Sequence, residues 1–190
     1  AVDELRRGRP SLSLFLCVGV GAALIYSIQS LFRGGHVYFE VAATVYSNVE
    51  MIGLTDDDTF LVHGGAGGIG SFAIQYAKSV GAIVIATAGS EGKLNYCRSI
   101  GADYAISYRG DWPAAVREVA RDGVHMILDN MGAKYLTDHV QLLATDGSLV
   151  NIGLQGGRGG TLGLATLMGK RGLITANSLR ARSVEEKAAI

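Results

Sequence analysis

From residue 59 onward, short apolar runs alternate with stretches in which apolar residues recur every three or four positions. The first run, Thr59–Val62, has the length of a buried strand, and the apolar residues between Phe72 and Val80 follow the spacing of a helix. A second apolar run, Ala82–Thr87, follows at once. A strand, a helix and a strand within about 30 residues predict a βαβ unit, whose two strands are parallel.

The same alternation continues to residue 177, and turn residues separate the elements. Gly81 and Gly101 stand where a glycine commonly ends a helix, and Asp111 precedes a helix with Pro113 in its first turn. Six strands with intervening helices predict a Rossmann-type α/β fold, a doubly wound parallel sheet of about six strands. After the first two strands, the predicted elements are helix 91–100, strand 104–107, a helix after 111, strand 125–129, a helix over 135–143, strand 148–152, a crossover at 162–170 and strand 173–177.

A glycine-rich turn joins the first predicted strand to the first helix. Gly65, Gly67 and Gly70 match the G-x-G-x-x-G spacing of dinucleotide-binding turns. We expect the first glycine to allow the sharp turn, the second to let a pyrophosphate approach the backbone, and the third to let helix and strand pack closely. The free N–H groups at the helix N-terminus would face the phosphates. In a chain with 27 glycines the motif alone is weak, and a turn that binds nothing is the alternative.

Ligands of doubly wound sheets bind at the carboxyl ends of the strands. We therefore expect the residues that follow the predicted strands to form one rim. These residues are 63–70, 87–90, 107–108, 129–132 and 151–154.

The end of the second strand indicates which dinucleotide binds. NAD sites usually place Asp or Glu there to bind the ribose 2′-OH, whereas this chain has Ala88, Gly89 and Ser90. Lys93 follows in the first turn of the next helix, where the helix dipole disfavours a cation. A 2′-phosphate would account for this lysine, and Ser90 would donate a second hydrogen bond. The pattern predicts NADP(H) rather than NAD, with a solvated surface lysine as the alternative.

Composition excludes several other classes of function. Acidic and basic residues balance at 17 each, so the chain lacks the charge excess of a nucleic-acid-binding protein. Cys17 and Cys97 do not form a Cys-x-x-Cys pair, which predicts neither a disulfide framework nor a zinc site. The histidines show no metal-ligand spacing, so each is expected to be a single structural histidine; they are His36, His63, His125 and His139. No catalytic residue can be named.

Residues 1–39 differ in kind from the rest and form an unrelated apolar N-terminal segment. Residues 12–32 contain no charged side chain, and about 20 such residues can cross a bilayer. Arg6, Arg7 and Arg9 precede them. A membrane anchor, a segment packed on the rest of the chain and a misjoined reading frame all stay open. The protein is expected to be cytoplasmic, with membrane anchoring through 12–32 as the alternative.

From Glu40 to Ile190 the sequence resembles the nucleotide-binding half of the zinc-independent quinone oxidoreductases, in the medium-chain dehydrogenase/reductase superfamily. The match covers about four fifths of the chain and rests on an ordered set of pieces rather than on one motif. The pieces are Ala43–Asn48, His63–Gly70, Thr87–Lys93, Gly101–Tyr108, Ile127–Gly132, Gly147–Gly153 and Leu179–Lys187.

The resemblance implies hydride transfer from NADPH to a quinone or an α,β-unsaturated carbonyl. It also implies that Gly67, Gly68 and Ile69 line the pyrophosphate. The resemblance places three further residues, Gly89, Lys93 and Tyr108, around the 2′-phosphate. Tyr108 ends the third strand beside the second, so its hydroxyl would reach the same phosphate as Lys93.

Other residues receive a role from the resemblance alone. Asn130 would lie near the adenosine, Gly153 and Leu154 near the nicotinamide, and Thr44 at the cleft between the two halves of the enzyme. Family members pair the edge strand, here 173–177, to form a homodimer.

Family members also carry a β-rich, chaperonin-10-like catalytic domain before this region and continue beyond it. We therefore expect an NADP-binding Rossmann domain at 40–190, as a fragment that lacks most of the substrate site. A non-catalytic NADP-binding module is the alternative. A short-chain dehydrogenase is disfavoured because no tyrosine is followed by lysine four residues later, and a zinc alcohol dehydrogenase because no Cys/His ligand set exists.

Overall fold

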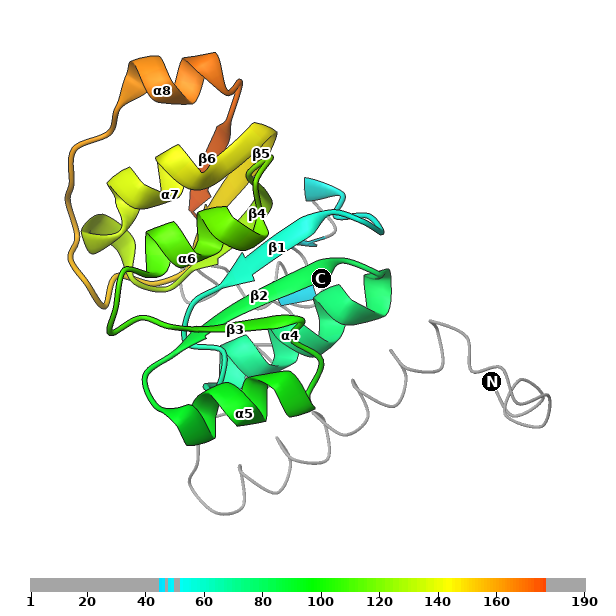
Figure 1. Cartoon of the computed structure of the whole chain (residues 1–190). Helices are drawn as coiled ribbons and strands as arrows, with labels where there is room; N and C mark the ends of the chain where they lie inside the picture. Colours follow the sequence, from blue (N-terminus) through cyan, green and yellow to red (C-terminus); the bar gives the residue numbers. More distant parts are fainter. Residues whose placement is uncertain (1–44, 47, 50–51, 177–190) are drawn as a thin grey trace, which may run out of the picture.

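A computed structural model describes residues 45–46, 48–49 and 52–176. Its centre is a six-stranded sheet in the order β3-β2-β1-β4-β5-β6, in which every neighbouring pair is parallel (Figure 1). From β1 the chain adds β2 and β3 on one side of the sheet, and it then adds β4, β5 and β6 on the other side. The predicted doubly wound parallel sheet is confirmed. Its strands are β1 (Thr59–Val62), β2 (Ile83–Ala88), β3 (Tyr104–Ser107), β4 (Val124–Asp129), β5 (Leu143–Asn151) and β6 (Leu173–Ala176).

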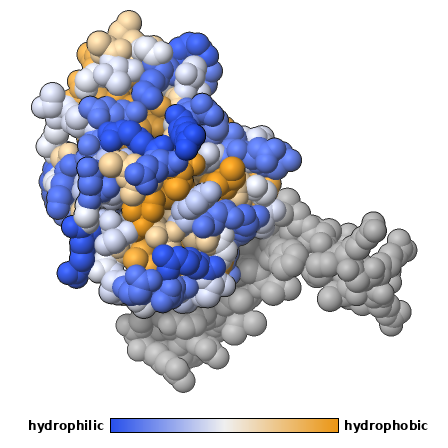
Figure 2. All heavy atoms as spheres, in the orientation of Figure 1, coloured by the Kyte–Doolittle hydropathy of each residue, from blue (hydrophilic) through white to orange (hydrophobic). Residues whose placement is uncertain are grey.

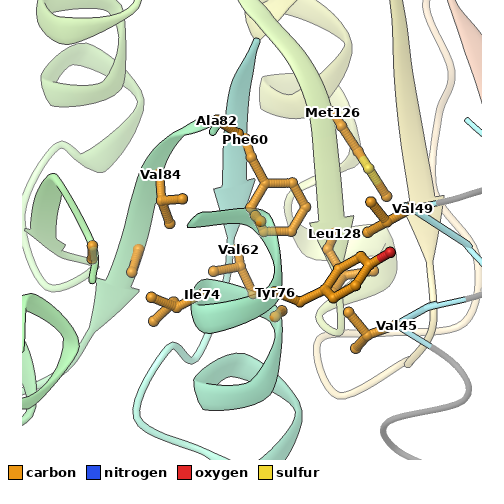
Figure 3. Close-up of a cluster of buried hydrophobic side chains, with 14 of the residues drawn as sticks. Val45, Val49, Phe60, Val62, Ile74, Tyr76, Ala82, Val84, Met126 and Leu128 are labelled. Carbon is orange, nitrogen blue, oxygen red and sulfur yellow. The ribbon is translucent and has the colours of Figure 1, made fainter. Parts of the chain in front are cut away.

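Helices cover both faces of this sheet. On β1, Phe60 and Val62 face a core that contains Ile74 of α4, and Leu61 faces a second core that contains Val116 of α6. Figure 3 shows the first of these cores, with side chains of α4 against those of β1. Alternate residues of one strand therefore bury against opposite layers, as a parallel sheet covered on both sides requires. The helices are α4 (Gly68–Val80), α5 (Glu91–Ser99), α6 (Trp112–Val119), α7 (Leu136–Leu142) and α8 (Leu164–Gly169), with a 3-10 turn η1 (Gly132–Lys134).

The predicted turn residues end and begin the helices. Gly81 has a φ of 102° and closes α4, with its N–H donating to the carbonyl groups of Ala77 and Lys78. At the start of α6, the Asp111 carboxylate accepts a hydrogen bond from the Ala114 N–H at 3.1 Å. These contacts satisfy backbone groups that a helix end leaves without a partner inside the helix.

The fifth strand differs from its prediction. It begins at Leu143, not at 148, and α7 ends one residue before it. Leu143 pairs with Val124 of β4, and a Cβ on Gly147 would lie 2.8 Å from the Val124 carbonyl oxygen. The glycine thus allows the two backbones to approach where the pairing register shifts. This close approach depends on a strand more than twenty residues earlier, so local periodicity does not indicate it.

Several predictions lie partly or wholly outside the described residues. Among them are the apolar segment 1–39, including 12–32, the cleft residue Thr44, the piece Leu179–Lys187 and the last residue of strand 173–177. Among the residues that are described, no helix combines the length and the apolar character needed to span a bilayer.

Candidate functional site

The turn after β1 is built from glycines with different tasks. Gly64 carries the left-handed conformation, with a φ of 66°, so it rather than Gly65 makes the sharp turn that the sequence assigned to Gly65. A Cβ on Gly65 would lie 2.9 Å from both Ala86 Cβ and Cys97 Sγ. Gly65 is therefore the glycine that lets the turn pack on β2 and α5. A Cβ on Gly70 would lie 2.6 Å from Gly65 Cα, which agrees with the predicted close packing of the helix.

The N-terminus of α4 has backbone donors without a capping side chain. Gly67 is its N-cap, no side chain caps it, and no acidic residue stands in its first turn. The Gly67 N–H donates to the Gly64 carbonyl oxygen at 2.8 Å. The next three N–H groups, from Gly68, Ile69 and Gly70, lie in the first turn of the helix, where no side chain caps them. Gly67 and Gly68 are exposed. This end of α4 has the features that favour an anion.

The predicted 2′-phosphate residues gather where β2 and β3 end. The ring of Tyr108 lies against Gly89, where a Cβ would come within 2.2 Å of the Tyr108 hydroxyl oxygen. Ser90 is the N-cap of α5, and its side chain makes no capping hydrogen bond. Lys93 is exposed and forms no ion pair with the residues that the structure describes. The structure therefore brings Gly89 and Tyr108 into contact, with Ser90 and Lys93 at the same strand–helix junction.

The other half of the rim is formed by the ends of β4 and β5. A Cβ on Gly64 would lie 3.2 Å from Asn130 Nδ2, and one on Gly153 would lie 2.8 Å from the Asn130 carbonyl oxygen. That carbonyl accepts a hydrogen bond from the Gln155 N–H at 3.2 Å. Leu154 is exposed beside this loop. Asn130 thus joins the glycine turn to the loop that carries Gly153 and Leu154, while Thr44 lies outside the described residues.

Below the rim lies a polar cluster that the sequence did not indicate. His63, directly after β1, and His139 of α7 are buried, and their Nε2 atoms are 2.8 Å apart. His63 Nδ1 lies 2.9 Å from the Thr87 hydroxyl oxygen. Trp112 and Tyr135 enclose the pair, with ring centroids 4.8 and 5.1 Å from that of His63. The expectation of single histidines is wrong for these two, because positions 76 residues apart meet only in the folded chain.

Asp129 lies at the edge of this cluster and orders the end of β4. It is buried, and its carboxylate accepts hydrogen bonds from the N–H groups of Met131 and Gly132 and from Asn151 Nδ2 at 2.7 to 2.9 Å. Burial raises the pKa of Asp129, and these hydrogen bonds act in the opposite direction. Burial lowers the pKa of both His63 and His139, so both imidazoles are neutral at pH 7. Within the described ranges, no three His, Cys, Asp or Glu side chains gather in a way that could hold a metal ion.

A family model described as zinc-binding dehydrogenase matches residues 68–189, which include α4 and the carboxyl ends of β2, β3, β4 and β5. The chain belongs to this family. Its resemblance to the medium-chain dehydrogenase/reductase superfamily is confirmed, and the matched region is the nucleotide-binding half.

Individual members of the superfamily agree with this assignment. Prostaglandin reductase-3 of Mus musculus is 32% identical over 139 residues, which are 72% of this chain and 36% of that protein. The structure of Escherichia coli quinone oxidoreductase complexed with NADPH is 29% identical, with a TM-score of 0.70 over 80% of this chain and 48% of its own. An NAD-dependent alcohol dehydrogenase is 33% identical, with a TM-score of 0.68 over 73% and 41% of the respective chains.

The chain spans about a third of the length of the curated relatives that it matches, with 32, 36 and 34% coverage for the first three. The zinc-independent character drawn from the sequence stays a prediction.

Proposed function

We propose that residues 40–190 form the NADP(H)-binding domain of an oxidoreductase that reduces a quinone or an α,β-unsaturated carbonyl. The observation that carries this proposal is the N-terminus of α4, which follows the carboxyl end of β1 and has exposed glycines and N–H groups without a capping side chain. Backbone donors and the positive end of the helix dipole suit a pyrophosphate there. When bound, the nicotinamide of such a cofactor supplies a hydride.

Different residues of the rim would bind different parts of the cofactor. Gly67, Gly68 and Ile69 would hold the pyrophosphate, and Asn130 the adenosine. The loop that carries Gly153 and Leu154 would hold the nicotinamide. Thr44, which lies outside the described residues, stays a predicted contact at the cleft.

The choice of NADP(H) over NAD rests on the junction of β2 and α5. Ala88, Gly89 and Ser90 provide no carboxylate for a ribose 2′-OH, and the first acid, Glu91, is paired with Arg98 at 3.2 Å. Lys93, Ser90 and the Tyr108 hydroxyl instead offer donors to a phosphate. The NADPH complex of the E. coli quinone oxidoreductase supports this choice, whereas the NAD-dependent alcohol dehydrogenase shows that the same fold also accompanies NAD.

Affinity measurements on the whole chain test the cofactor. NADPH should bind more tightly than NADH, and Lys93→Ala should weaken NADPH about tenfold while leaving NADH unchanged, as expected for one lost charge-assisted hydrogen bond. Arg121→Ala is the matched control, because it removes the same charge from the loop before β4, at the opposite end of the sheet. An equal loss for both dinucleotides would contradict a role in phosphate binding.

A non-catalytic NADP-binding module is the second candidate, because the features described above concern cofactor binding and include no catalytic side chain among the described residues. Oxidation of NADPH by 1,4-quinones, followed by absorbance, separates the two. Turnover by the purified chain supports an oxidoreductase, and tight NADPH binding without turnover supports the module.

A further inference from the structure

We propose that His139 is a positioning residue for the dinucleotide turn: its Nε2 accepts a hydrogen bond from His63 Nε2–H, within a buried chain directed from Thr87 to Asp129. The proposal rests on the proposed function only in taking the turn after β1 as the cofactor cradle. The direction of the chain is a separate claim, which can be measured without cofactor.

The direction follows from what each atom can donate or accept. Two neutral imidazoles whose Nε2 atoms are 2.8 Å apart share one proton, so one donates and the other accepts. His139 Nδ1 is buried, has no hydrogen-bond partner, and lies 3.8 Å from the Asp129 carboxylate. A carboxylate attracts an N–H and repels a ring-nitrogen lone pair, and burial strengthens both effects. The proton of His139 is therefore on Nδ1, and its Nε2 is the acceptor.

The remaining positions then follow one after another. His63 carries its proton on Nε2, so its Nδ1 accepts from the Thr87 hydroxyl at 2.9 Å. The opposite direction would leave a bare nitrogen of His139 facing Asp129 in a buried site. In the direction proposed, every polar atom of Thr87 and His63 in the chain is satisfied, and the long contact to Asp129 is electrostatically favourable.

This series of hydrogen bonds is connected to the backbone of the turn after β1. His63 directly precedes Gly64, and the Gly65 N–H donates to the Thr87 carbonyl oxygen at 2.9 Å. Thr87 thus holds the turn twice, through its carbonyl group and, by way of His63, through its hydroxyl. At the other end, Asp129 holds the N–H groups that follow β4 and the side chain of Asn151. The chain links the carboxyl ends of β2, β1, β4 and β5 under the rim.

The tautomers are the first test. Ring ¹⁵N spectra of the full chain, assigned with single histidine variants, should show His63 protonated at Nε2 and His139 at Nδ1 at neutral pH. The reversed pair, or a doubly protonated His139, would overturn the direction. This measurement needs no bound cofactor, and variants at His36, His63 and His125 assign the fourth histidine by elimination.

Variants test the positioning role. His139→Leu removes the acceptor and should weaken NADPH binding about tenfold, whereas His139→Gln keeps an amide oxygen and should weaken it less than about threefold. Exchange of the Gly65 amide should become faster in His139→Leu and recover in His139→Gln. The matched control is His125→Leu, since His125 accepts from the Thr59 N–H at the amino end of β1 and should affect neither measurement.

The outcomes separate the two proposals. If the wild-type protein fails to bind NADPH, the proposed function is wrong. The tautomers and the exchange of the Gly65 amide still test the series of hydrogen bonds from Thr87 to Asp129. If folded His139→Leu keeps the exchange rate of Gly65 and the affinity for NADPH, the positioning role is wrong.

Discussion

At the scale of single residues, Gly65 and Gly67 should respond differently to the same substitution. A methyl group on Gly65 would meet Ala86 Cβ and Cys97 Sγ at 2.9 Å in a buried layer. We expect Gly65→Ala to lower the free energy of unfolding by about 1–3 kcal/mol, as overpacking does. Urea denaturation measures it, and Gly92→Ala, where no atom lies within 4 Å of the new Cβ, is the control. Equal stabilities of the two variants would mean that the turn can move away from β2.

Gly67→Ala should instead alter binding more than stability. The new Cβ would contact only the Gly64 carbonyl oxygen, at 3.2 Å, and Gly67 is exposed. If a pyrophosphate approaches this backbone, the methyl group keeps it away, and NADPH affinity should fall by about tenfold or more. Calorimetric titration with NADPH is the measurement, and a variant that binds as wild type does would remove Gly67 from the cradle.

The buried histidines predict a particular acid sensitivity. In the folded chain the pKa of His63 and of His139 is lowered by burial, whereas in the unfolded chain both titrate near 6.5. Below pH 6.5 the unfolded state therefore binds more protons, and stability falls as the pH falls towards the folded pKa values. Each histidine contributes a slope of about 1.4 kcal/mol per pH unit well below 6.5.

Unfolding free energies between pH 7 and 5 test this slope. His139→Leu should reduce the slope of stability against pH by the contribution of one histidine. This holds whatever effect the substitution has on stability at pH 7. His125→Leu is the comparison, since the His125 side chain is 41% exposed and lies at the amino end of β1. Asp129, whose pKa burial raises, opposes the trend in wild type, so the difference between variants is the relevant quantity. Identical slopes for wild type and His139→Leu would mean that His139 titrates normally.

At the scale of elements, the helix caps of α5 and α6 are built differently. Asp111 caps α6 through its side chain, while Ser90 begins α5 without a side-chain hydrogen bond. We expect Asp111→Ala to cost about 1 kcal/mol of stability and Ser90→Ala less than about 0.5 kcal/mol. If the Ser90 hydroxyl is kept for a phosphate, Ser90→Ala should weaken NADPH but not NADH. Thermal unfolding with and without each dinucleotide measures both effects.

At the scale of the whole molecule, β6 is the element most suited to a partner. Among the described residues it forms one edge of the sheet, with Leu173 exposed, and Leu164 and Met168 of α8 are exposed as well. Figure 2 shows apolar residues among the hydrophilic ones at the end of the molecule that carries α8. An uncovered edge strand offers unpaired backbone groups to a second chain, which supports the proposal of a homodimer through 173–177.

The mass in solution tests this dimer. Wild-type chain should have twice the monomer mass, and Leu173→Lys should shift it towards one chain without changing NADPH affinity, because the rim lies elsewhere on the sheet. Ile83→Lys, at an exposed position near the start of β2, controls for the added charge. A monomeric wild type would refute the homodimer.

Much of the fold could be predicted because the relevant interactions are local. The strands before β5 follow from short apolar runs, and Gly81, Gly101 and Asp111 act on backbone groups a few residues away. The G-x-G-x-x-G spacing of the turn is local in the same sense, whereas the contacts of Gly65 with Ala86 and Cys97 are not. β5 is the exception, since Gly147 is needed for its approach to Val124 rather than for its own turn.

The sequence by itself therefore determined the βαβ periodicity, the glycine turn, and the lack of an acid at the end of β2. Only the tertiary structure decided that Tyr108 lies on Gly89, that Gly64 rather than Gly65 makes the turn, and that His63 meets His139. The physical reason is the order of the strands. Parallel pairing brings the ends of β1, β2, β4 and β5 together, and contacts between residues 24 or 76 positions apart leave no periodic trace in the chain.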